Sequence, residues 1–340
     1  MKKMVGFGDF LVRLNPPGYL RFLQAGQFEV NYTGAEANVC VSLAMMGMET
    51  SFVTRLPDNE IARCGLAALH KLGVGTAHVV MGGERIGLLY VEKGASQRPS
   101  RVVYDRGHTA FATASASDFD WDTLLTGAEL FHFTGITPAL GDALPDICLQ
   151  ACQRAKERGV LVSCDLNYRR NLWTPERAKE VMERLMPYVD VLIANEEDAE
   201  KVFGIRAANT DVTKGQLDRD GYVQVAQQIE SRYGVKTVAI TLRRSISASD
   251  NDWGAMLYTG GMSYFSRTYA VHLVDRVGGG DSFSAGLLFG IGSGFDPQKT
   301  IEYAAAASCL KQTMEWDVNL ASREEIELLA AGDGSGRVRR

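Results

Sequence analysis

No stretch of this sequence approaches the ~20 consecutive apolar residues that a transmembrane helix requires. The first residues, MKKMVGFGDFLVRL, contain two lysines but only a short apolar run interrupted by glycines and Asp9, so they predict a β-strand and no signal peptide. An excess of positive charge is also missing, because 36 Lys and Arg residues stand against 41 Asp and Glu residues, a net charge of -5. We therefore expect a protein that binds neither membranes nor nucleic acids.

Cysteine and histidine are too few and too scattered for a zinc site or a disulfide framework. None of the six cysteines forms a CxxC pair, and only five histidines are available as further ligands. Most cysteines lie in apolar runs such as VCVSL and LVSCDL, where buried free thiols are expected. Free thiols are typical of a reducing compartment, so we expect a cytoplasmic protein.

Short β-rich segments alternate with helical patterns along most of the chain. The segments that read as buried strands cover residues 5–10, 51–56, 129–135, 160–167, 189–195 and 236–242. Between two of them, Leu144, Ile147, Cys148 and Ala151 repeat at helical spacing, and Gly159 is placed to end that helix. The alternation predicts an α/β fold with a mainly parallel central sheet, helices on both faces and ligands beyond the carboxyl ends of the strands. No internal repeat or linker divides the chain, so we expect a single domain over residues 1–340.

Two segments, residues 10–32 and 84–108, interrupt this alternation without a long helix between their strands. Turn residues divide each of them, Pro16-Pro17-Gly18 in the first and Gly94 to Pro99 in the second, as in β-hairpins. We expect them to form a small second sheet, a lid over the strand ends; the alternative is that they are merely edge strands. The last residues, 331–340, are expected to be disordered.

The segment DRVGGGDSFSAG places Gly278, Gly279 and Gly280 directly before Asp281 and before a helical pattern of small residues. Bare N–H groups at a helix N-terminus attract an anion, and Asp281 would then be a carboxylate beside that anion. Alternatively, Asp281 is an ordinary N-terminal cap, although a cap does not require three glycines. The chain contains neither GxxxxGK[ST] nor a complete dinucleotide fingerprint, which argues against a P-loop nucleotidase and a Rossmann dehydrogenase.

A second segment of small residues, TGAEANVCVSLAMMG, predicts a helix near the N-terminus. Gly34 precedes this helix, and Glu36 and Asn38 are polar residues in its first turn. The alternative is an ordinary helix start, in which Thr33 is the cap and Glu36 completes a capping box.

Together, the two segments resemble the two signature motifs of the PfkB/ribokinase family of sugar kinases, in the same order and at a matching spacing. The resemblance covers nearly the whole chain and implies a ribokinase-like three-layer sandwich in which the small sheet is the lid. The family's usual GAGD is GGGD here, which keeps every backbone N–H group. Arg276 follows Asp275 where a small residue or proline is usual, which adds a charge near the phosphate path.

The resemblance implies ATP-dependent phosphorylation of a sugar hydroxyl. Asp281 would accept the proton of that hydroxyl, and the N–H groups of Gly278 to Gly280 would stabilise the charge on the transferred phosphate. In the segment NEEDAE, Asn195 and Asp198 resemble the family's NxxE motif near Mg²⁺, with aspartate at the glutamate position. The alternative is an acidic helix start. Dependence on a monovalent cation stays open.

Residues 241–256, TLRRSISASDNDWGAM, stand where the family has a tight glycine-rich turn that contacts the nucleotide. This chain has Arg243, Arg244 and a polar insertion in place of that turn. Thr241 and Arg243, together with Asn195, are the expected nucleotide contacts.

Further positions resemble those with which the 2-keto-3-deoxygluconate kinases of this family bind their substrate, and FTGITPAL, DLNYRRNLW and WDVN match that subgroup too. They are Gly34, Asn38, Tyr90, Tyr104, Arg106, Asn167, Arg169 and Asp317. Tyr104 and Arg106 are two residues apart in a strand and should share a face. Because arginine binds a carboxylate in bidentate fashion, Arg106 and Arg169 favour an acidic sugar over fructose or ribose.

Two of these residues have simpler alternatives. Arg106 would instead pair with Asp105 or Glu84 on a solvated surface, and Asp317 would be an ordinary solvated loop carboxylate. Asp9, at the end of the first strand, is a further candidate contact for a sugar hydroxyl.

The sequence thus predicts a kinase that uses ATP and Mg²⁺ to phosphorylate the terminal hydroxyl of 2-keto-3-deoxygluconate. The alternatives are another kinase of the family, of fructokinase or ribokinase type, and a sugar- or nucleoside-binding sensor without catalysis. The intact GGGD argues against the sensor, because binding alone requires no base. Dimers are usual for the family, and exposed lid strands would allow a homo-oligomer, although no pattern in the sequence demands one.

Overall fold

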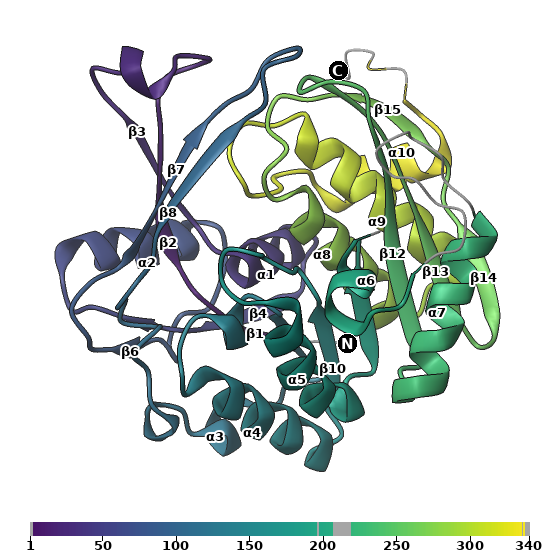
Figure 1. Cartoon of the computed structure of the whole chain (residues 1–340), viewed down its shortest axis with the longest axis horizontal. Coiled ribbons are helices and arrows are strands. Elements are labelled where there is room, and N and C mark those ends of the chain that lie inside the picture. The colour runs from purple at the N-terminus through teal and green to yellow at the C-terminus, as the bar shows by residue number, and fades with distance from the viewer. Residues whose placement is uncertain (1–2, 196, 207–218, 335, 337–340) are drawn as a thin grey trace.

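The computed structural model describes residues 3–195, 197–206, 219–334 and 336. Within these residues a central sheet of nine strands has the order β14-β13-β12-β11-β10-β9-β1-β4, and β15 pairs with the other half of β13 (Figure 1). The strands are β1 (Lys3–Phe7), β4 (Glu49–Val53), β9 (Leu130–Thr134), β10 (Leu161–Asp165), β11 (Val191–Ala194), β12 (Thr237–Ser245), β13 (Asp250–Thr259), β14 (Met262–Phe265) and β15 (Tyr269–His272).

The six strands predicted from the sequence are confirmed, with boundaries that differ by a few residues. β4, β1, β9, β10, β11 and β12 run parallel to one another, and β13 continues the sheet in the antiparallel direction. All five residues of β9, LFHFT, are buried, which explains why this strand reads as a nearly continuous apolar run. The carboxyl ends of the parallel strands meet at one edge of the sheet, where this fold class binds its ligands.

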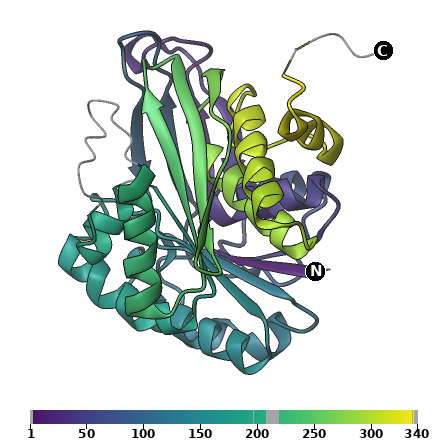
Figure 2. The same cartoon turned by 90° about the vertical axis from the view of Figure 1, so that its right-hand side faces the viewer.

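Helices cover both faces of the central sheet and complete three layers (Figure 2). One apolar core lies between the sheet and α3 to α7, and a second lies between the sheet and α1, α2 and α8 to α10. The predicted helix that starts at Leu144 is α4, and Gly159 follows it with a φ of 69°. The α/β three-layer architecture is therefore confirmed. The helices are α1 (Ala35–Met45), α2 (Glu60–Lys71), α3 (Trp121–Leu124), α4 (Leu144–Glu157), α5 (Pro175–Leu185), α6 (Asp198–Phe203), α7 (Arg219–Tyr233), α8 (Gly279–Gly292), α9 (Pro297–Gln312) and α10 (Arg323–Ala331).

A separate four-stranded sheet, called the small sheet below, projects beyond the central sheet at the upper left of Figure 1. Its order is β3 (Glu29–Thr33), β2 (Leu11–Asn15), β7 (Gly87–Glu92) and β8 (Arg101–Asp105). Two antiparallel hairpins are joined by the parallel pair β2 and β7, so the second sheet predicted from residues 10–32 and 84–108 is confirmed. These strands do not extend the edge of the central sheet. A further short pair, β5 (Arg55–Leu56) and β6 (Val80–Met81), lies outside both sheets.

The C-terminal residues were expected to be disordered from residue 331 onward. Ala331 is the last residue of α10, and Gly332 caps this helix with a φ of 109°. Residues 335 and 337–340 lie outside the described part of the chain. Among the helices that the structure describes, none is long and apolar enough to cross a bilayer.

Candidate active site

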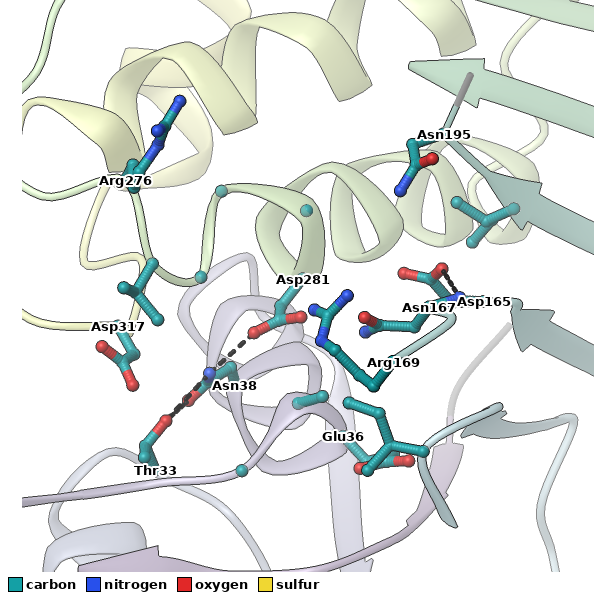
Figure 3. A pocket seen from close by; sticks show the side chains of 18 of the residues that line it. Thr33, Glu36, Asn38, Asp165, Asn167, Arg169, Asn195, Arg276, Asp281 and Asp317 are labelled. Carbon is teal, nitrogen blue, oxygen red and sulfur yellow. Dashed lines mark hydrogen bonds between the residues drawn. The ribbon is translucent and has the colours of Figure 1, made fainter. Parts of the chain in front are cut away.

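A cavity of about 430 Å³ lies at the carboxyl ends of β1, β10 and β11, between the small sheet and the start of α8 (Figure 3). All but one of the predicted site residues line it. These are Gly34, Asn38, Tyr104, Arg106, Asn167, Arg169, Asn195, Asp198, Thr241, Arg243, Gly278, Gly279, Gly280, Asp281 and Asp317. The fold thus gathers positions from nearly the whole chain around one cavity.

The three glycines before Asp281 differ in what their missing side chains allow. Gly278 caps α8 with a φ of 81°, and a Cβ atom there would stand 1.8 Å from the carbonyl oxygen of Asp317. A Cβ atom on Gly279 would meet Gln312 at 3.2 Å, whereas one on Gly280 would meet no protein atom within 4 Å. Gly278 is therefore needed for the fold of the loop, while Gly280 leaves its backbone open toward the cavity.

The N–H groups of this loop are only partly used by the protein. The N–H group of Gly279 donates to the carbonyl oxygen of Arg276 over 3.3 Å. Within the described residues, the N–H groups of Gly280 and Asp281 have no acceptor. Unpaired donors at the positive end of a helix form an anion site.

Asp281 is the third residue of α8 and is not its cap, so the capping alternative for this residue is wrong. Its Oδ2 atom accepts a hydrogen bond of 2.7 Å from the Nδ2 atom of Asn38 on α1. Burial raises the pKa of Asp281 to about 6, although the Asn38 hydrogen bond lowers it. A carboxylate with a pKa near neutrality is suited to accept a proton from a hydroxyl group.

The alternative for the start of α1, a capping box of Thr33 and Glu36, is also wrong. Gly34 is the cap, and a Cβ atom on it would stand 2.2 Å from the carbonyl oxygen of Asp9. The Glu36 carboxylate instead accepts hydrogen bonds of 2.7 to 2.9 Å from Thr137 and from the N–H and hydroxyl groups of Thr134. These hydrogen bonds join α1 to the end of β9 beside the cavity. Burial raises the pKa of Glu36. The sequence reading mentioned Glu36 only as a helix-start residue and missed this role.

Tyr104 and Arg106 bring an aromatic ring and a positive charge from the small sheet. The Arg106 guanidinium lies 4.0 Å from the centre of the Tyr104 ring, so the two side chains share a face as predicted. Asp105 pairs with Arg85 over 2.7 Å, and Arg106 has no ion pair within the described residues. The alternative that Arg106 is neutralised by Asp105 or Glu84 is therefore wrong.

Tyr90 is the predicted site residue that the structure places elsewhere. In the register of the small sheet, Leu89 aligns with Tyr104 on the face toward the cavity, and Tyr90 aligns with Val103 on the opposite face. The Tyr90 ring packs against Phe28, with 6.0 Å between the ring centres. Because successive residues of a strand point to opposite faces, an error of one position moved this side chain out of the site.

The end of β10 and the loop after it supply three groups, from Asp165, Asn167 and Arg169. Asn167 has a φ of 38°, a strained value for a residue other than glycine, and its N–H group donates to Asp165 over 3.1 Å. Figure 3 shows the Arg169 side chain turned toward Asp281. Burial, reinforced by the charges of Asp198 and Asp281, raises the pKa of Asp165 well above its usual range. Asp165 was missed as a site residue, although its place at the carboxyl end of a parallel strand was a usable signal.

Asp198 is the first residue of α6, which agrees with the alternative of an acidic helix start. It is also buried and lines the cavity. Its carboxylate accepts hydrogen bonds of 3.2 Å from the N–H groups of Tyr168 and Asn195. Burial raises the pKa of Asp198 to about 6. Glu196, within the same NEEDAE segment, lies outside the described residues.

Residues 241–256, where nucleotide contacts were predicted, belong to a long hairpin of β12 and β13. Thr241 and Arg243 both line the cavity, whereas Arg244 pairs with Asp252. Arg276 lines the cavity too, and burial together with the charge of Arg243 lowers the pKa of Arg276. Arg243 and Arg276 thus bring two interacting positive charges to the wall of the cavity.

Asp317 lines the cavity but is not a solvated loop carboxylate, because only 1% of its surface is exposed. It forms an ion pair with the buried Arg13 of β2. The sequence reading assigned no role to Arg13, whose partners are far from it along the chain.

The fold and the residues gathered around this cavity are those of a phosphotransferase, with a glycine loop and a buried carboxylate on one helix and arginine side chains elsewhere on the cavity wall. Residues 1–315 match the model of the pfkB family of carbohydrate kinases, and the chain belongs to that family. The family expected from the two motifs is thus confirmed, and the chain is a kinase that phosphorylates an alcohol group of a carbohydrate.

Relatives with named activities agree with this class. A 2-dehydro-3-deoxygluconokinase of known structure from Thermotoga maritima is 51% identical, with a TM-score of 0.94 over 98% of this chain and 100% of the other. A 2-dehydro-3-deoxygalactonokinase from Haloferax volcanii is 31% identical over 98% of both chains. A 2-dehydro-3-deoxygluconokinase from Thermoproteus tenax is 30% identical over 97% of this chain and 95% of the relative.

Proposed function

We propose that this kinase transfers the γ-phosphate of ATP to the terminal hydroxyl of 2-keto-3-deoxygluconate, which is also called 2-dehydro-3-deoxygluconate. The observation that carries the proposal is a single cavity with Asp281 and the open Gly280 backbone on one side and the Tyr104–Arg106 pair on the other. The similar kinases from T. maritima and T. tenax carry the same substrate in their names.

At the phosphate end, Asp281 accepts the proton of the attacking hydroxyl. The pKa of Asp281, raised by burial to about 6, leaves the carboxylate mostly ionised at neutral pH but still basic enough to take a proton. The backbone from Gly278 to Gly280 and the positive end of α8 stabilise the charge on the transferred phosphate. Removing one such donor typically lowers turnover by ~10²–10³-fold.

Nucleotide binding is assigned to Asn195, Thr241 and Arg243, with Arg276 as a further cation beside them. A Mg²⁺ ion bound together with ATP usually needs only one or two protein carboxylates, since phosphates and water supply its other ligands. Asp198 fits this requirement, and within the described residues no cluster could hold a metal ion by itself. The ion would supply positive charge to the phosphates.

At the sugar end, Arg106 distinguishes an acidic sugar from a neutral one. Its Nε atom is buried without a hydrogen-bond partner, and a ligand carboxylate would provide one. Asp9 lies nearby with a buried Oδ2 atom that also lacks a partner, and burial raises the pKa of Asp9 to about 6. Gly34, Asn38, Asn167 and Asp317 complete the proposed sugar contacts, and Arg169, turned toward Asp281, acts nearer the reacting hydroxyl.

The proposal is tested by ADP release from purified protein with Mg²⁺ and a panel of sugars. The panel contains 2-keto-3-deoxygluconate, its galactonate counterpart, fructose and ribose, and we expect the two sugar acids to react fastest. If fructose or ribose reacts faster at matched concentrations, the protein is a kinase of the fructokinase or ribokinase type. If no sugar releases ADP but the sugar acid still binds, the protein is a sensor.

The variant Arg106→Ala sharpens the same test. Loss of a charged hydrogen bond should raise the KM for the sugar acid by ~10–100-fold, with little effect on a neutral sugar. Arg85→Ala is the matched control, because Arg85 lies in the same region but pairs with Asp105 outside the cavity. Equal losses for acidic and neutral sugars would contradict a carboxylate contact at Arg106.

The cellular location and the oligomeric state are also part of the proposal. All six cysteines are free and five are buried, which supports a reducing, cytoplasmic location. Val30 and Val103 are more than half exposed on the face of the small sheet away from the cavity, which supports a homo-oligomer through this sheet. Sedimentation of the purified protein tests whether it forms this homo-oligomer.

A further inference from the structure

Arg13 is a fully buried arginine at the centre of the small sheet. In its guanidinium group, the Nε atom donates to Asn15 over 3.0 Å and the Nη2 atom donates to Asp275 over 2.6 Å. The Nη1 atom pairs with Asp317, and the group also lies over the ring of Trp316. A buried charge of this kind is costly unless all its partners are in place, so the contacts fix its position closely.

Both carboxylate partners of Arg13 flank the glycine loop. Asp275 lies three positions before Gly278, and its second carboxylate oxygen accepts a hydrogen bond of 3.0 Å from the N–H group of Val277. Asp317 packs against the loop from the other side, because its carbonyl oxygen occupies the space that a Cβ atom on Gly278 would need. Figure 3 shows Asp317 beside the segment that leads into α8.

Two further observations indicate that this arrangement is held firmly. The buried Lys311 donates to the carbonyl oxygen of Asp275 over 2.9 Å, so a second cation supports the same segment. Trp316, which precedes Asp317, has a φ of 67°, a conformation that a bulky residue adopts only where its surroundings impose it. The two cations and two carboxylates balance one another within the buried cluster.

Arg13 also belongs to the face of the small sheet that borders the sugar. It aligns with Leu89 and through it with Tyr104, and Leu89 and Tyr104 both line the cavity. One strand, β2, therefore connects the sugar-binding face with both sides of the phosphate-binding loop. No other contact of the small sheet reaches Asp275 among the hydrogen bonds and ion pairs of the described residues.

We propose that Arg13 is a positioning residue, which holds the Gly278–Gly280 loop at the distance from the small sheet that phosphoryl transfer requires. Arg13 does not line the cavity, so its effect on the reaction passes through Asp275 and Asp317. The inference rests on the proposed function, because it assigns the glycine loop to the transferred phosphate. A change of Arg13 should therefore lower turnover more strongly than it lowers the affinity for the sugar.

The test compares Arg13→Lys with wild-type protein in steady-state kinetics. Lysine keeps the charge but cannot reach three acceptors in a plane. We expect kcat to fall by ~10²-fold, the effect of a displacement of about 1 Å in a catalytic group, while the KM for the sugar changes by less than about threefold. A folded variant with kcat within threefold of wild type would overturn the proposal.

Arg55→Lys is the matched control for stability. Arg55 pairs with Asp118 and donates to the carbonyl oxygen of Ala110 over 3.0 Å, away from the cavity. We expect its melting temperature to fall while kcat stays unchanged. If Arg55→Lys lowers kcat as much as Arg13→Lys does, the effect is general loss of structure and the proposal is wrong.

A second variant and a second measurement cover the remaining cases. If Arg13→Lys does not fold, Asp275→Asn removes one charge of the cluster and should show the same fall in kcat with a nearly constant sugar KM; unchanged kcat would overturn the inference. If the wild-type chain phosphorylates no sugar, the proposed function fails. Amide hydrogen exchange in residues 276–281 then tests separately whether Arg13 holds the Gly278–Gly280 loop in place. Faster exchange in these residues of Arg13→Lys supports the proposal that Arg13 holds the loop, and unchanged exchange contradicts it.

Discussion

The glycine loop before Asp281 and the small sheet border the same cavity, but they are built by different means. The loop places backbone N–H groups and one carboxylate within four consecutive residues, Gly278 to Asp281, at the start of a helix. The small sheet supplies side chains from four strands, and which of them face the cavity depends on strand register. In the proposed function, the residues for the chemical step are therefore adjacent in the sequence, while those for the choice of sugar are spread over several strands.

Asp281→Asn is expected to produce the largest effect, because it removes the proposed base from the loop. Asparagine has nearly the same shape and can still contact Asn38, but it cannot accept the hydroxyl proton. We expect kcat to fall by ~10²–10⁴-fold, with the KM for ATP nearly unchanged, in an assay of ADP release. Thr33→Ala, which removes a hydroxyl group bonded to Asn38 and not to Asp281, is the control. Turnover close to wild type in Asp281→Asn would rule out this residue as the base.

The next effect separates two neighbouring glycines of the loop. A methyl group on Gly280 meets no protein atom, so Gly280→Ala should fold normally, yet it places the methyl group in the phosphate site. We expect turnover to fall by ~10²-fold, comparable to the loss of one donor. Gly279→Ala places its methyl group against Gln312 on the buried side, and turnover should stay within a few-fold of wild type. Equal kinetics of the two variants would show that the phosphate does not approach Gly280.

The local character of the loop explains how much of it the sequence revealed. Three glycines and an acid in a row have few uses in a folded protein, so Gly278 to Asp281 were assigned without knowledge of any other element. The parallel sheet was equally accessible, because its buried strands are apolar runs such as VLIA in β11.

The small sheet shows why the remainder was not predictable. Residues 87–92, GLLYVE, contain apolar side chains on both faces, so no alternation distinguishes Leu89 from Tyr90. Arg13 gives no local signal either, because its partner Asp275 is 262 positions away along the chain. Strand register and ion pairs between distant residues are set when the whole chain packs together, so the sequence alone does not predict them.

A smaller effect follows from pH. Burial raises the pKa of Asp281 to about 6, so kcat/KM should be constant above this pH and fall by roughly tenfold for each unit below it. The same shift stabilises the folded protein as the pH falls from about 6 toward 4, because the folded state binds a proton that the unfolded state has released. Loss of activity near pH 5 is therefore expected from protonation of Asp281 in the folded protein and is not a sign of unfolding.

The variant Asn38→Ala identifies the group whose protonation lowers kcat/KM at acidic pH, the acidic limb of the pH profile. The pKa values of Asp9 and Asp198 are also raised by burial to about 6, so the wild-type profile alone does not identify the group. The Asn38 hydrogen bond lowers the pKa of Asp281, so its removal should move the limb to higher pH. A limb that stays in place would belong to another carboxylate.

The smallest expected effect tests the register of the small sheet directly. Tyr104→Leu removes the ring beneath Arg106, and the lost interaction should raise the KM for the sugar acid by roughly two- to fivefold. Tyr90→Leu is the same substitution on the opposite face, where the ring packs against Phe28, and the kinetics should not change. Steady-state kinetics with 2-keto-3-deoxygluconate compare the two variants at one pH. If Tyr90→Leu has the larger effect, the strand presents its other face to the sugar and Leu89 points away. Because a slip of one residue exchanges the two faces completely, even a fivefold difference between these variants decides which face is correct.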